Sequence, residues 1–90
     1  MSDRNVQHVH GVADATIRTG AGKLRLAVLT AGSDAATLIL YDNTAASGTK
    51  LLTLAAVTGT TVRVPCSALF AIGLQADISG TDAAFMLEFE

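Results

Sequence analysis

Apolar residues recur at every second position over much of this chain, and turn-forming residues interrupt the pattern about every ten positions. The clearest case is the segment from Ala68 to Ile78, in which one face is expected to point inward: Phe70, Ile72, Leu74, Ala76 and Ile78. Helices need apolar spacings of three and four, which are missing here. The pattern predicts an all-β chain of six to eight short strands. An antiparallel β-sandwich follows, either jelly-roll-like or immunoglobulin-like, and the residues do not choose between the two topologies.

The strongest strand signal surrounds the middle of the chain, between Ala36 and Leu54. Thr37–Tyr41 and Lys50–Leu54 are rich in residues that suit a pleated, buried surface. The residues between them, 42–49, are small, polar or glycine, and they allow the backbone to reverse. We therefore expect a β-hairpin with a long tip at 42–49.

Further strands are predicted on both sides of this hairpin. Residues 13–18 alternate, as do residues 23–31, where Leu24, Leu26 and Val28 are expected on one face and Arg25, Ala27 and Leu29 on the other. The predicted strands 23–31 and 37–41 carry apolar residues on both faces, which places them in a sheet whose outer face meets a partner. Toward the C-terminus we expect a short strand over 61–64 ended by Pro65, a strand over 68–78, and a last strand with Phe85, Leu87 and Phe89 inward.

The composition points to association with other subunits. Half of the 90 residues are apolar and 16% are charged, against about 25% in an ordinary soluble domain. A core of this size gives modest stability, and Cys66 has no second cysteine with which to form a disulfide. Subunit contacts are the expected supplement.

Charge and hydropathy exclude other classes of partner. The net charge is −2, with no basic run and few aromatic side chains, so we expect no nucleic-acid binding. No apolar run approaches the ~20 residues of a membrane helix, and the first residues lack the apolar core of a signal peptide, so we expect no membrane contact and assembly in the cytoplasm. Residues 1–10 are polar and are expected to form a flexible arm, while 11–90 form a single domain.

The sequence contains a few residues of reactive types, and structural roles account for them. His8 and His10 share one side of an extended backbone, but no downstream residues complete a zinc site within one chain. Only a symmetric oligomer, in which three arms meet, would bring further histidines together. Cys66 lacks a nearby base, and its expected role is that of a small buried thiol. Asp77 and Glu88 are predicted on neighbouring strands and could form the pair of carboxylates that glycoside hydrolysis needs. Both side chains are expected to face outward, and few aromatic residues are present to bind a sugar, so we do not expect this activity. We expect no enzyme activity, no catalytic residue, no cofactor and no metal.

Aspartates that border turns are expected to accept backbone N–H groups: Asp34, Asp42, Asp77 and Asp82. Asp42 with Asn43 lacks the spacing of a calcium loop. The candidate interface residues come from the arm, from the 23–31 strand and from the tip: Val6, His8, Val9, His10, Arg25, Leu29, Asp42, Asn43, Thr44, Ser47 and Thr49.

The run from Thr37 to Leu51, preceded by Leu29–Ala36 and followed by Ala76–Thr81, resembles small β-rich structural proteins of tailed bacteriophages and prophages. The resemblance covers roughly residues 11 to 90 and carries no functional residues over. It implies a virion component: a decoration or cement protein that self-associates and clamps neighbouring subunits of the major capsid protein, with a homotrimer suggested by the three-fold positions of a capsid. A head-to-tail or tail accessory subunit, or a carbohydrate-binding module that uses the 42–49 loop, is the alternative.

Overall fold

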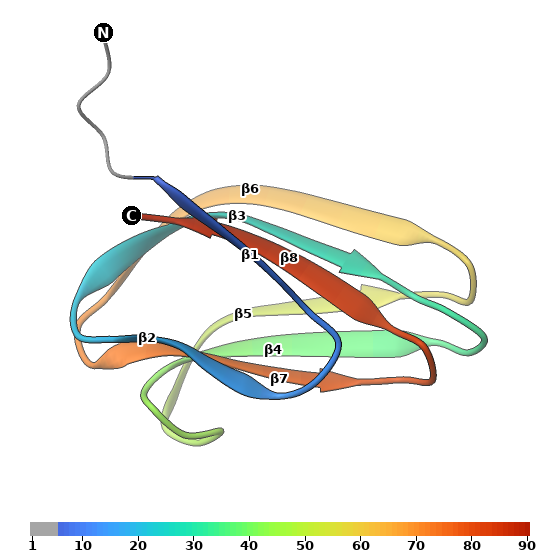
Figure 1. Cartoon of the computed structure of the whole chain (residues 1–90), viewed down its shortest axis with the longest axis horizontal. Helices are drawn as coiled ribbons and strands as arrows, with labels where there is room; N and C mark the ends of the chain where they lie inside the picture. Colours follow the sequence, from blue (N-terminus) through green and yellow to red (C-terminus); the bar gives the residue numbers. More distant parts are fainter. Residues whose placement is uncertain (1–5) are drawn as a thin grey trace, which may run out of the picture.

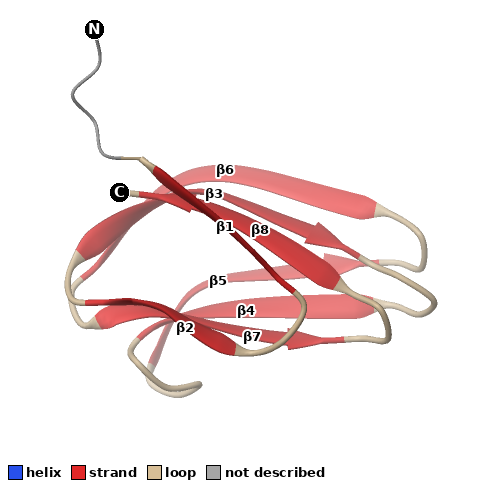
Figure 2. Ribbon diagram, viewed as in Figure 1, coloured by secondary structure: helices blue, strands red, loops and turns tan. Residues whose placement is uncertain are grey.

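A computed structural model describes residues 6–90, and the regular structure in that range consists of strands, with no helix (Figures 1 and 2). The prediction of an all-β chain with six to eight short strands is therefore confirmed. In chain order the strands are β1 (Gln7–Gly11), β2 (Ala15–Thr19), β3 (Gly22–Thr30), β4 (Ala36–Asp42), β5 (Thr49–Ala56), β6 (Thr61–Phe70), β7 (Gly73–Ser79) and β8 (Ala84–Phe89).

The strands form two four-stranded sheets, ordered β1-β8-β3-β6 and β2-β7-β4-β5, in which all neighbours are antiparallel. Four of the pairings join β1 to β8, β2 to β7, β3 to β6 and β4 to β5. The chain is thus one long hairpin, reversed at the tip between β4 and β5, that rolls up so that β3 also pairs with β8 and β4 with β7. This is the topology of an eight-stranded jelly roll, which decides between the two predicted sandwiches.

The core lies between the two sheets and is built from leucine. Six leucines are the largest fully buried side chains: Leu24, Leu29, Leu38, Leu40, Leu74 and Leu87. In β8 the predicted inward set of Phe85, Leu87 and Phe89 is confirmed, because all three are buried. Leu38 and Leu40 of the predicted mid-chain hairpin lie in β4 and are buried in the core from the side of the opposing sheet.

The predicted faces of β3 are wrong beyond Leu24. A register shift lies between Leu24 and Leu26, so Arg25 has no residue opposite it on β8. Such a bulge moves the following side chains to the other face of the sheet. Ala27 and Leu29 are therefore in the core, and Leu26 is only half-buried.

Pro65 does not end its strand, as the sequence had predicted. β6 continues to Phe70, and Pro65 lies opposite Leu26 beside the same register shift. Proline lacks the N–H that a central ladder needs, but it is tolerated at edges and bulges. β6 offers both, since it is the edge strand of its sheet.

The predicted strand over 68–78 is in fact two strands in different sheets. β6 ends at Phe70 and β7 begins at Gly73, with a reversal at Ala71 and Ile72. The inward position predicted for Ile72 is wrong, because this residue lies in the corner and is 57% exposed, whereas Phe70 and Leu74 on either side are buried. The alternation of apolar residues continues through the corner, which explains why it was read as one strand.

Two other predictions need correction. The arm expected at 1–10 does not extend to Gln7–His10, because these residues belong to β1 and pair with β8 from Gln7 opposite Phe89 to Gly11 opposite Phe85. Residues 1–5 lie outside the described part of the chain. The strands predicted over 23–31 and 37–41 do not share a sheet, since β3 and β4 are central in opposite sheets.

Replacement of Leu87 by Ala tests the position of the core. Leu87 is fully buried in a strand with neighbours on both sides, so Leu87→Ala should lower the free energy of unfolding by about 2–5 kcal/mol in urea denaturation. Leu69→Ala is the matched control, because Leu69 is 74% exposed and its loss should change stability by about 0.5 kcal/mol or less. Equal effects of the two substitutions would contradict the packing described here.

Candidate functional site

The tip between β4 and β5 is fixed at its base by the carboxylate of Asp42. Its Oδ1 accepts the backbone N–H groups of Ala71 at 3.0 Å and of Ile72 at 2.8 Å, in the turn between β6 and β7. These N–H groups, Ile72 first and then Ala71, lower the pKa of the Asp42 carboxyl. One side chain therefore joins the mid-chain hairpin to a turn about thirty residues further along the chain.

A second contact holds the tip against β2 and β7. The Thr16 hydroxyl donates to Oε1 of Gln75 at 2.6 Å and lies 3.3 Å from the carbonyl oxygen of Thr44. A methyl group on Gly73 would lie only 3.0 Å from the carbonyl oxygen of Asn43, so glycine allows this close approach. The tip turns back toward these strands (Figure 1).

Two buried side chains beside the tip face away from the core. Tyr41 and Gln75 are opposite each other in the β4–β7 pairing, next to the inward-facing Leu40 and Leu74. Alternation places Tyr41 and Gln75 on the outer face of the sheet, yet each is 8% exposed. The only tyrosine of the chain is therefore not available for stacking against a ligand.

Within the tip, side chains and backbone bond to each other. The Asn43 amide nitrogen donates to the Ser47 carbonyl oxygen at 3.0 Å, and the Asn43 amide oxygen accepts the N–H of Thr44 at 2.8 Å. Gly48 has a φ of 89°, a conformation that favours glycine. The exposed crest, residues 44–49, presents only small side chains.

The candidate interface residues of the tip thus divide into two kinds. Asp42 and Asn43 are half-buried and bond within the protein, whereas Thr44, Ser47 and Thr49 are exposed. The expectation that Asp34 and Asp42 accept backbone N–H groups is confirmed, since Asp34 accepts the N–H of Thr81 at 2.6 Å. The contact role of the tip residues stays a prediction.

The other candidates lie on the sheet formed by β1, β8, β3 and β6. His8 and His10 are exposed, and Nδ1 of His8 is 3.7 Å from the Glu88 carboxylate. Val6 is half-buried, and Val9 packs against the core. Within residues 6–90 no three His, Cys, Asp or Glu side chains are grouped so that they could hold a metal ion.

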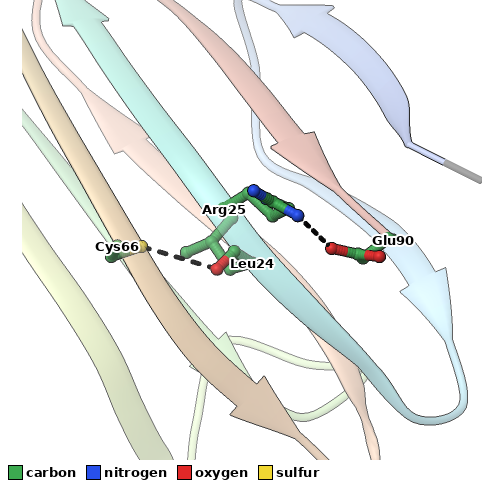
Figure 3. A network of polar contacts seen from close by, with 4 residues as sticks. All are labelled: Leu24, Arg25, Cys66 and Glu90. Carbon is green, nitrogen blue, oxygen red and sulfur yellow. Dashed lines mark hydrogen bonds and ion pairs between the residues drawn. The ribbon is translucent and has the colours of Figure 1, made fainter. Parts of the chain in front are cut away.

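Arg25 and Leu29 of β3 lie in different surroundings, and only Leu29 departs from its predicted role; for half-buried Arg25 the contact role stays a prediction. The Arg25 guanidinium donates to the Glu90 carboxylate at 2.6 Å, an ion pair that Figure 3 shows beside the bulge. Leu29 is fully buried, so it is not an interface residue. Leu29 was predicted to face outward because the alternation of residues in β3 gives no sign of the bulge at Arg25.

Cys66 is half-buried, and its thiol donates to the Leu24 carbonyl oxygen at 3.6 Å (Figure 3). Burial raises the pKa of the Cys66 thiol, which lowers the fraction present as the nucleophilic thiolate at neutral pH. The carboxylates of Asp77 and Glu88 are not on neighbouring strands, contrary to our expectation. They belong to β7 and β8, which lie in opposite sheets.

Asp77 has a different neighbour, which the sequence did not reveal. Asp14 accepts the N–H of Ile78 at 2.7 Å, and Asp14 and Asp77 interact. Desolvation, followed by the hydrogen bond and the charge of Asp14, raises the pKa of the Asp77 carboxyl. The two residues are far apart in the sequence and meet only because β2 pairs with β7, so no local pattern could have found them.

Comparisons with protein-family models, with curated proteins and with solved structures found no match. No pocket was found on the part of the chain that the structure describes. That part also holds no helix long and apolar enough to span a membrane.

Replacement of Asp42 by Asn tests the anchor of the tip. The backbone N–H groups favour the carboxylate, so Asp42 stabilises the fold above the ordinary carboxyl pKa of about 3.9, and this contribution is lost as the pH falls through the lower pKa of the folded state. Asp42→Asn should lower the melting temperature at pH 7 by about 5 °C, and the difference from the wild type should close in acid.

Asp77→Asn is the control, because the pKa of Asp77 is shifted in the opposite direction. A raised pKa makes Asp77 stabilising below its unfolded pKa, and this contribution is lost as the pH rises through the folded value. Asp77→Asn should therefore raise the melting temperature at pH 7. If Asp42→Asn melted like the wild type at pH 7, the carboxylate would not be the anchor.

Proposed function

We propose that this chain is a non-enzymatic structural subunit of a bacteriophage virion, specifically a capsid decoration or cement subunit that self-associates and contacts neighbouring capsid subunits. The observation that carries the proposal is the position of the resembling segment. The run from Thr37 to Leu51 forms β4, the tip and the start of β5, which is the hairpin about which the whole chain is rolled.

The character of the exposed surface supports a docking role. The crest of the tip is held in place from its base and offers small side chains and backbone groups, which suits contact by shape. A surface that is fixed before binding loses little conformational entropy on association. Viral capsid proteins are among the users of the jelly-roll fold, although a fold alone does not assign a function.

The carbohydrate-binding alternative has less support. Sugar platforms usually need exposed aromatic rings, and Tyr41 next to the tip is 8% exposed, while the three phenylalanines Phe70, Phe85 and Phe89 are buried in the core. Jelly rolls also include lectins. Glycan binding by the intact chain is therefore the outcome that would favour this alternative.

The experiment is a protein inventory of particles induced from the bacterial strain that carries the gene. Particles are purified on a density gradient, heads are separated from tails, and both are analysed by mass spectrometry. We expect the chain in a fixed ratio to the major capsid protein in the head fraction. Its presence only in tails would favour the accessory role, and its absence from particles that contain all other virion proteins would contradict the proposal.

A further inference from the structure

The jelly roll leaves four strands at sheet edges, namely β1 and β6 in one sheet and β2 and β5 in the other. An edge strand presents unpaired N–H and C=O groups, which can pair with another chain. Proteins usually block such edges with proline, charged side chains, bulges or short strands. The four edges of this protein differ in how far they are blocked.

Three of the edges carry such features. β6 has Pro65 and the exposed Arg63. β2 is five residues long and has a register shift between Thr16 and Arg18. β1 is also five residues long and is polar on its exposed side, where His8 lies near Glu88.

β5 lacks these features over most of its length. It has eight residues, and from Leu51 to Ala56 it contains no charge, proline or glycine. Its ladder pairs with β4 only, and the side away from β4 has no strand partner among residues 6–90. Its register shift lies near the start of the strand, which leaves Leu52–Ala56 as a regular segment with exposed Thr53 and Ala55 and with no second strand paired to it.

We propose that β5 pairs antiparallel with β5 of a second copy of this chain, so that two four-stranded sheets join across a two-fold axis near Leu54. This inference deepens the proposed function and rests on its self-association, because it names the surface through which two subunits meet. The contact is a strand addition, in which backbone hydrogen bonds supply much of the affinity. The same strand on both sides makes the interface isologous and closed.

Charge favours a second copy in this orientation. Lys50 is the only charged residue of β5 and lies near one end. Antiparallel pairing about Leu54 separates the two Lys50 residues by roughly 25 Å along the strands, beyond the screening length of about 10 Å. A parallel arrangement would bring them side by side. The outward side chains that would face each other, Thr53 and Ala55, are small and uncharged.

The test is the mass of the full chain in solution, measured by sedimentation over a range of concentrations. We expect a concentration-dependent dimer for the wild type. Thr53→Lys and Thr53→Glu each place like charges across the axis and should weaken the dimer by at least about tenfold. An equimolar mixture of the two variants should restore it, which a merely misfolded variant could not do.

Ser67→Lys is the matched control, because Ser67 is exposed on the edge strand β6 and its replacement should leave the dimer intact. A wild-type monomer at every concentration, a trimer, or a Thr53→Lys variant as dimeric as the wild type would overturn the β5 interface. Equal dissociation by Ser67→Lys would also overturn it. A β5 dimer that is absent from virions would instead contradict the proposed function alone.

Discussion

Antiparallel pairing between the two halves of the chain is the constraint on which this structure depends. Each strand of the first half pairs with its counterpart in the second half, so that β1 meets β8 and β4 meets β5. The two sheets then close around a leucine core, because the inward residues of both halves face the same interior. A β-sheet that is buried on one face gains stability only when its register is kept, since a slip of one residue would expose that face.

The same pairing determines which parts of the surface are fixed and which strand edges stay exposed. The hairpin reverses at a tip whose base is tied to the β6–β7 turn by the Asp42 carboxylate, so the exposed crest is held at a fixed position. The outer face next to the tip is covered, with Tyr41 and Gln75 nearly buried. The small residues of the crest stay exposed, and the Leu51–Ala56 edge of β5, which carries no charge, has no strand partner among residues 6–90. Both are suited to contacts through backbone and shape.

Local patterns in the sequence predicted the fold class, the mid-chain hairpin and the inward residues of β8, because alternation and turn residues are local signals. They could not predict the bulge at Arg25, which places Leu29 in the core, or the corner at Ala71 and Ile72, where alternation continues across a change of sheet. The polar composition of residues 1–10 suggested a flexible arm, but residues 7–10 form a strand because they pair with β8.

Contacts over long sequence distances were also hidden. The bond from Asp42 to the β6–β7 turn and the pairing of Asp14 with Asp77 exist only after the chain has rolled up. The candidate site was therefore predicted in part: the tip was located, but the reason for its fixed shape was not. The choice of β5 as the open edge needed the strand order, which alternation does not contain.

In the proposed assembly, subunits associate through the backbone edge of β5. This pairing can be detected by amide hydrogen exchange of the full chain, measured at low and at high protein concentration. We expect amides of Leu52–Ala56 that do not pair with β4 to gain protection at high concentration, while those of β6 are unchanged. Protection that rises instead at β6 or at the tip, or that does not depend on concentration, would contradict it.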